Sequence, residues 1–199
     1  DDGLEIVRLP FEFSWRGLPA LNFTHVTVTS NGVMFVGNST SNGCCSPDAI
    51  ALDGPYQEEK RIAIAQTDLN PASKGTIYTG VLGDAIVVSW EGVPRFRPHL
   101  STEFGLYFQI SLRSCGEIEL RWGEGDADPR DQFAAGIQDA EAGIAVPVTG
   151  DPFLENLGRT REGTWPRDQC RKFVPDADGN YLEVTGRHGG ALPSDNERI

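Results

Sequence analysis

Apolar and polar residues alternate strictly in the most regular part of the chain. Residues 106–113 read LYFQISLR and residues 118–122 read IELRW, so every second side chain is apolar in both segments. Because successive side chains of a β-strand point to opposite faces, this pattern predicts two half-buried strands. The segment Ser114-Cys115-Gly116 between them is typical of a turn, so we expect a β-hairpin.

Shorter segments with the same alternation recur before and after this hairpin. Residues typical of turns separate them, for example Ser30-Asn31-Gly32 and Gly83-Asp84. No stretch has helical periodicity over more than one or two turns. About eight or nine short strands predict an all-β fold, an antiparallel, jelly-roll-like β-sandwich. The predicted strands cover residues 25–29, 33–36, 61–66, 76–82, 85–90, 106–113, 118–122, 133–138 and 144–148.

The composition changes after about Val148. Residues 151–199 are rich in Gly, Pro and charged residues and hold only isolated apolar residues, so this segment cannot build a core of its own. We expect three parts: an N-terminal strand or arm at residues 1–8, a sandwich at 9–150, and an irregular extension at 151–199 that lies along the sandwich. Within the extension, residues 175–180 predict the turn of a small hairpin.

The net charge of −12, from 17 basic and 29 acidic residues, disfavours nucleic acid and anionic membranes as partners. No segment approaches the ~18 consecutive apolar residues of a membrane span. The chain begins at Asp1 without an apolar leader, so we expect any secretion signal to have been removed.

The four cysteines are Cys44, Cys45, Cys115 and Cys170. They form no Cys-x-x-Cys pair and no His lies within a few residues of them, so the spacing favours disulfides over a zinc site. Adjacent cysteines seldom meet disulfide geometry. We therefore expect two bridges, each from one of the adjacent pair to one of the distant cysteines, with either connectivity open, and a Cys44–Cys45 bond as the less favoured alternative. The bridge to Cys170 would tether the extension.

Two acceptor sequences for N-linked glycan lie close together, at Asn22-Phe23-Thr24 and Asn38-Ser39-Thr40. Such sites are modified only at the surface of proteins in the secretory pathway. Together with the even number of cysteines, they predict a secreted, extracellular glycoprotein.

Two acidic clusters are candidate calcium sites, and Ca²⁺ is the only cofactor that the sequence raises. Ca²⁺ takes six to eight oxygen ligands, and neither cluster has a complete calcium-binding loop, so a solvated turn is the alternative for each. The first cluster holds Asp126, Asp128 and Asp131 beside Glu124, and the second holds Asp176 and Asp178 beside Asn180.

The opening segment 9–15, LPFEFSW, followed by 26–37, VTVTSNGVMFVG, resembles the start of nidogen-like extracellular domains. Segments 64–71, 75–78, 86–94, 108–110, 116–118 and 135–139 follow that family's order, and the resemblance covers about residues 7–148. Residues 65–68 depart from the family's aromatic-rich strand, and residues 42–47 and the chain from 151 on have no counterpart. Membership would imply a matrix or adhesion role without known catalysis.

No catalytic motif is present in the sequence, so we expect a module that is not an enzyme. We predict an extracellular structural or adhesive module that assembles with copies of itself; a carbohydrate- or calcium-dependent binding module and, more distantly, a secreted hydrolase are alternatives. Trp15, Trp90 and Trp122 are expected in the core. The candidate assembly residues are Leu4, Ile6, Phe153 and Trp165.

Overall fold

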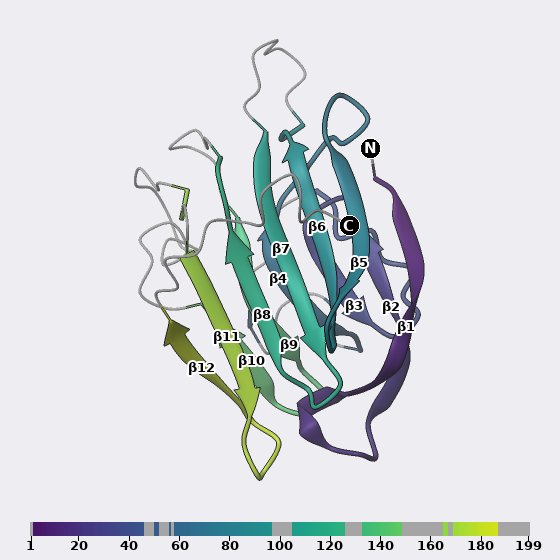
Figure 1. Ribbon diagram of the computed structural model, residues 1–199, viewed down its shortest axis with the longest axis vertical. Helices are drawn as coiled ribbons and strands as arrows, with labels where there is room; N and C mark the ends of the chain where they lie inside the picture. Colours follow the sequence, from purple (N-terminus) through teal and green to yellow (C-terminus); the bar gives the residue numbers. More distant parts are fainter. Residues whose placement is uncertain are drawn as a thin grey trace.

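The chain forms two antiparallel six-stranded β-sheets packed face to face (Figure 1). The computed structural model describes residues 2–45, 50–51, 56, 58–96, 105–125, 133–148, 165–166 and 169–186. Sheet 1 contains, in spatial order, β1 (Leu4–Ser14), β2 (Asn22–Thr29), β3 (Val33–Val36), β4 (Lys60–Gln66), β9 (Ala134–Asp139) and β10 (Ile144–Pro147). Sheet 2 contains β12 (Tyr181–Gly186), β11 (Gln169–Pro175), β8 (Ile118–Trp122), β7 (Leu106–Arg113), β6 (Ala85–Val93) and β5 (Thr76–Leu82).

The predicted all-β sandwich is confirmed. It has more strands than the eight or nine predicted, and they are connected more simply than the strands of a jelly roll. The first four strands run as a meander in sheet 1 and the next four as a meander in sheet 2, after which β9 and β10 return to sheet 1. Most neighbouring strands are therefore consecutive in the sequence, which differs from jelly-roll order. The predicted hairpin of β7 and β8 has the expected strict alternation of buried and half-buried residues.

Residues 169–186 confirm the predicted hairpin turn at residues 175–180 and correct the prediction that the C-terminal extension is irregular. They form the hairpin of β11 and β12, and β11 pairs with β8, which extends sheet 2 by two strands. The alternation of β11 is obscured by charges that are neutralised by partners: the Arg171 guanidinium lies 3.0 Å from the Glu183 carboxylate, and the Lys172 ammonium lies 2.7 Å from Glu117. The predicted arm at residues 1–8 likewise belongs to the sandwich, because β1 pairs with β2 from Leu4 onward.

Tryptophan side chains connect the two sheets across the core. The indole N–H of Trp90 on β6 donates to the Thr29 carbonyl of sheet 1 at 3.1 Å, and that of Trp122 on β8 donates to the Ile64 carbonyl at 3.0 Å. Trp15, in the short 3-10 turn Trp15–Gly17, donates to the Asp139 carboxylate at 2.7 Å. All three rings are buried, as the sequence predicts, and each polar N–H is satisfied inside the core.

The outer face of sheet 1 is also covered, which explains why its central strands are buried on both sides. Phe35 and Ala63 pack there with Ile50 and Tyr56 in a second apolar cluster. Beside this cluster the fully buried Arg61 donates hydrogen bonds to the Gln66 and Gln138 side chains, at 2.7 and 2.5 Å. The segment that covers this face carries Cys44 and Cys45.

Candidate functional site

The exposed large apolar side chains of the described residues lie, apart from Phe96, on strands at the sheet edges. Leu4 and Ile6 on β1 are among them, so these two predicted assembly residues lie at the surface. The others are Tyr78, Val81 and Leu82 on β5, and Leu182 and Val184 on β12. An edge strand presents unpaired backbone groups to any strand that approaches, so these positions are candidate docking sites.

The two edges of sheet 2 lack the devices that usually block edge pairing. β5 contains no charged residue and no proline. The only charged residue of β12 is Glu183, and it is paired with Arg171. By contrast, β1 carries Pro10 and a register shift, and β10 ends at Pro147. Proline, charge and bulges protect an edge, so β5 and β12 are the accessible edges of the described sandwich.

A groove of about 360 Å³ opens where β5 faces β1 at the side of the sandwich. Leu4, Val7, Val28 and Ile77 supply much of its apolar lining. Ser30 also lines the groove, and its buried hydroxyl has no hydrogen-bond partner among the described residues. The two sheets are therefore incompletely closed along this side.

Trp165, predicted as an assembly residue, belongs to the core instead. It is 5% exposed, it packs against Phe108 and Phe133, and its indole N–H donates to the Gly123 carbonyl at 3.0 Å. A side chain enclosed in this way is not available to a second subunit. Phe153, the remaining predicted assembly residue, lies outside the described residues.

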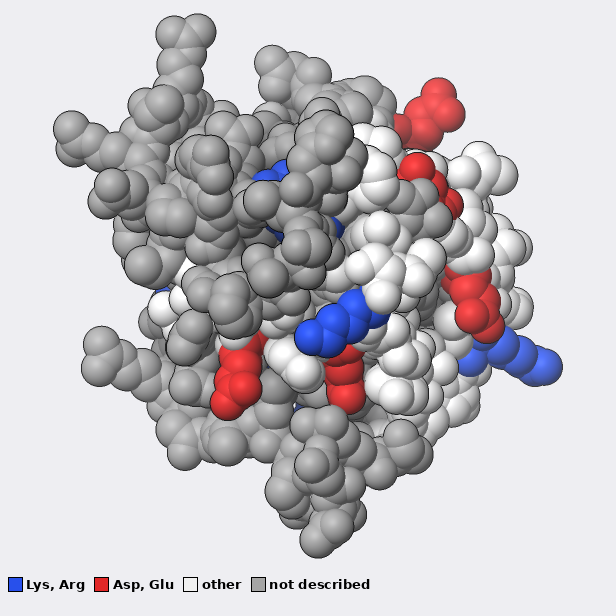
Figure 2. Space-filling view, turned by 90° about the horizontal axis from the view of Figure 1, so that it is seen from above, with Lys and Arg blue, Asp and Glu red and all other residues white. Residues whose placement is uncertain are grey.

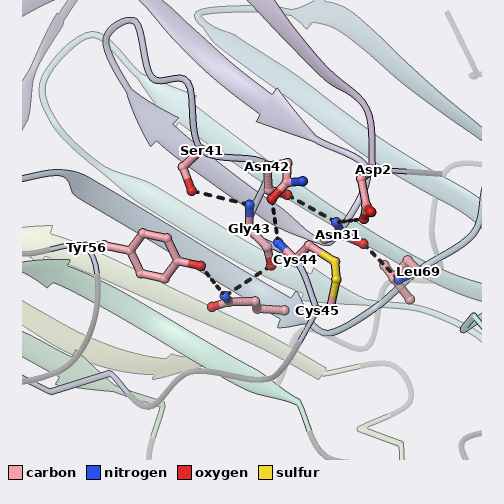
Figure 3. Close-up of a disulfide and its surroundings, with 10 residues drawn as sticks. Asp2, Asn31, Ser41, Asn42, Gly43, Cys44, Cys45, Tyr56 and Leu69 are labelled. Carbon is pink, nitrogen blue, oxygen red and sulfur yellow. Dashed lines mark hydrogen bonds between the residues drawn. A yellow bond between two sulfur atoms is a disulfide. The ribbon is translucent and has the colours of Figure 1, made fainter.

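The disulfide pairing also differs from the expectation. Cys44 is bonded to Cys45, and Cys115 and Cys170 are free (Figure 3). Cys170 pairs with Arg121 on β8, whereas Cys115 precedes Ile118 at the other end of that strand. The three-residue step along β8 from Arg121 to Ile118 already spans about 10 Å. This exceeds the ~7 Å limit between the α-carbons of two disulfide-bonded cysteines, so Cys115 and Cys170 are too far apart to bond. The adjacent pair is held at sheet 1, so a bridge to either distant cysteine is not formed.

The two free cysteines are expected to differ sharply in reactivity. Cys115 is exposed, whereas burial, reinforced by the charge of Glu119, raises the pKa of the Cys170 thiol to about 11. At pH 8 the reactive thiolate of Cys170 is then on the order of 0.1% of the population. Timed alkylation of the native protein, read by peptide mass spectrometry, should modify Cys115 at least about a hundredfold faster than Cys170. Equal rates would contradict this environment, and protection of both would indicate a bridge between them.

A single buried asparagine joins the segments around the disulfide (Figure 3). The Asn31 amide group donates to the Asp2 carboxylate and to the Asn42 carbonyl, each at 3.1 Å, and its side-chain oxygen accepts from the Leu69 backbone N–H at 2.9 Å. The Cys44 N–H donates to the Asn42 side chain at 3.0 Å. The start of the chain, the disulfide segment and the segment after β4 are thus fixed together.

This arrangement brings four metal-ligand residue types to one place. One ligand atom from each of Asp2, Cys44, Cys45 and Asp68 lies within 4.8 Å of every other. Burial raises the pKa of the Asp68 carboxyl, the negative charge of Asp2 raises it further, and the Arg95 guanidinium opposes the change. A cation would stabilise both carboxylates here. This site could not be predicted from the sequence, because Asp2 and Asp68 are far from the cysteines along the chain.

The acidic turn at Asp176 has a structural explanation. The Asp176 carboxylate accepts backbone N–H bonds from Asp178 and Asn180, at 2.9 and 2.8 Å, within the β11–β12 turn. These bonds, the one from Asn180 first, lower the pKa of Asp176. Calcium binding at Asp176 and Asp178 stays a prediction. Asp126, Asp128 and Asp131 lie outside the described residues.

Both predicted glycan acceptors are exposed. Asn22 begins β2, where its side-chain amide donates to Glu12 at 2.9 Å, and Asn38 follows β3. Their modification stays a prediction. Figure 2 shows separate acidic and basic groups, without one continuous patch of either sign over the described part of that face. None of the described residues forms a helix long and apolar enough to cross a membrane.

Comparisons of the chain with protein-family models, with curated proteins and with solved structures found no match. The resemblance to nidogen-like domains therefore stays a prediction, and so do the calcium, carbohydrate and hydrolase alternatives.

Proposed function

We propose that the chain is an extracellular structural or adhesive module whose copies join edge to edge into a filament. The observation that carries the proposal is the pair of unprotected edges of sheet 2. β5 is an uncharged strand of seven residues, and β12 is a strand of six residues whose one charge is neutralised within the same copy. An edge of this kind is a template for strand addition.

The position of the two edges favours a chain of copies over a closed pair. β5 and β12 are the opposite ends of one six-stranded sheet. When β12 of one copy pairs with β5 of the next, each copy keeps one free edge, and the contact repeats. A head-to-tail contact whose rotation does not close a ring produces a helical filament.

The groove beside β5 supports the same mode of association. A strand added to β5 would extend sheet 2 past the open side of the sandwich and cover the groove lined by Val7 and Ile77. Covering an apolar groove releases water from it, which stabilises the contact. The two candidate glycan acceptors belong to sheet 1 and to the residues after β3, so glycans at Asn22 and Asn38 would leave the edges of sheet 2 accessible.

Two valines and one isoleucine of nearly equal exposure allow a matched test. Val81 on β5 and Val184 on β12 are each 49% exposed, and Ile6 on β1 is 48% exposed. We expect Val81→Lys and Val184→Lys each to raise the concentration at which filaments form at least about tenfold, because a lysine charge would be buried in the contact. Ile6→Lys should leave that concentration unchanged. Analytical ultracentrifugation and negative-stain microscopy measure the effect.

A mixture of the two sheet 2 variants tests the head-to-tail arrangement directly. Val81→Lys leaves the β12 edge intact, and Val184→Lys leaves the β5 edge intact. At a protein concentration where the wild type assembles and neither variant does so alone, each variant should be monomeric, whereas an equimolar mixture should form dimers that do not extend. Wild-type protein that stays monomeric at every concentration would refute assembly, and dimers of a single variant would refute the head-to-tail contact.

A further inference from the structure

We propose that reduction of the Cys44–Cys45 disulfide creates a binding site for a zinc-like divalent cation, with Asp2, Cys44, Cys45 and Asp68 as its four ligands. None of the four ligands lines the groove beside β5, and the proposal does not depend on the edge-to-edge contact. Figure 3 shows the disulfide with Asp2 and Asn31 beside it.

The distances fit a four-coordinate site. Zn²⁺ binds thiolate sulfur at ~2.3 Å and carboxylate oxygen at ~2.0–2.2 Å in a tetrahedron, so neighbouring ligand atoms are roughly 3.3–3.8 Å apart. The four candidate ligand atoms already lie within 4.8 Å of one another. Breaking the bond between Cys44 and Cys45 lets the two sulfur atoms separate to the spacing that the tetrahedron requires.

Hydrogen bonds from neighbouring groups hold the ligand residues in place and leave ligand atoms available to the cation. Asn31 binds one oxygen of Asp2, which leaves the other carboxylate oxygen for the cation. The same side chain fixes the backbone at Leu69, next to Asp68, and the carbonyl of Asn42, two residues before Cys44. Asn31 itself is fully buried. Hydrogen bonds of this kind orient metal ligands and strengthen binding.

The charge balance also favours a cation. Two thiolates and two carboxylates carry four negative charges, and Zn²⁺ reduces the total to −2, the same as in a site of four cysteines. Arg95 lies close enough to lower the pKa of Asp68 and offsets part of the remainder. The mixture of sulfur and oxygen ligands suits a borderline-soft cation and not Ca²⁺ or Mg²⁺, which bind oxygen ligands.

The oxidation state of the cysteines controls the site. A dithiol reductant transfers two electrons to the disulfide: the S–S bond breaks, Cys44 and Cys45 each gain a proton as thiols, and the dithiol becomes a disulfide. Zn²⁺ then forms two Zn–S bonds and displaces both protons to solvent. In the oxidised protein only the two carboxylates remain as ligands, so the cation is bound weakly.

Cobalt(II) titration of the whole chain tests the proposal, with a phosphine used to reduce the disulfide. We expect the reduced protein to develop thiolate-to-cobalt charge-transfer absorption and the intense visible bands of tetrahedral Co²⁺, both lost when Zn²⁺ is added. The oxidised protein should bind at least about a hundredfold more weakly. Absence of the bands in the reduced protein, or equal binding by the oxidised protein, would overturn the proposal.

Substitutions at the proposed ligands test which residues bind the cation. Cys44→Ser combined with Cys45→Ser should abolish the charge-transfer band, whereas Cys115→Ser, which removes the exposed free thiol, should leave it unchanged. Asp68→Asn should keep the band and weaken cobalt binding at least about tenfold. If the double variant does not fold, alkylation of reduced wild-type protein replaces it: Zn²⁺ should protect Cys44 and Cys45 but not Cys115. Loss of the band in Cys115→Ser, or protection of Cys115 alone, would place the metal elsewhere and refute the site.

Discussion

Replacing Trp122 with Ala is expected to lower the free energy of unfolding by about 4 kcal/mol, the range found when a large buried aromatic is removed. The ring is 1% exposed and lies between the sheets. Its N–H donates to the Ile64 carbonyl, in the part of β4 where the register against β9 shifts between Ala63 and Gln66. The substitution therefore leaves a cavity and a buried carbonyl without its donor.

Denaturant unfolding, monitored by circular dichroism below the concentration of assembly, measures this loss. Trp122→Phe keeps one aromatic ring in the core but removes the N–H donor and the rest of the indole, so it should cost about 2 kcal/mol. Leu182→Ala, at a side chain 55% exposed on β12, should change the stability by no more than about 0.5 kcal/mol. A loss below about 1 kcal/mol for Trp122→Ala would show that the two sheets do not depend on this contact.

Gly136→Ala is expected to cost about 3 kcal/mol or more, although it adds only a methyl group. Gly136 lies in β9 between β4 and β10 and has a φ of +142°, a conformation that residues with a side chain seldom adopt. A β-carbon there would collide with the Val146 carbonyl oxygen and would lie 2.8 Å from the Pro147 α-carbon. Both obstacles are backbone atoms of β10, so relief requires that strand to move.

The matched control is Gly3→Ala, because a β-carbon at Gly3 would have no atom within 4 Å. We expect Gly3→Ala to change the unfolding free energy by less than about 0.5 kcal/mol in the same denaturant experiment. If the two alanine variants were equally stable, the close approach of β9 and β10 at Gly136 would be wrong.

The candidate sites could be predicted only in part. Leu4 and Ile6 were predicted from the sequence as candidate assembly residues, and both are exposed at the surface. The accessible edges at β5 and β12 could not be predicted, since local alternation identifies a strand but not whether a neighbour lies on both sides of it. The ligand cluster could not be predicted for a related reason: Asn31 joins segments that are far apart along the chain, since Asp2, Cys44 and Asp68 lie at least 24 positions from one another.

The sequence by itself determined the strands and turns of the regular hairpins. Residues 106–122 form the predicted hairpin because alternation, turn residues and burial all act over a few neighbouring positions. Tertiary structure decided that Arg61 is buried in a second layer, that Trp165 belongs to the core, that β11 completes sheet 2, and that Cys44 bonds to its neighbour. Each of these depends on which distant segments meet, and local periodicity carries no information about such long-range contacts.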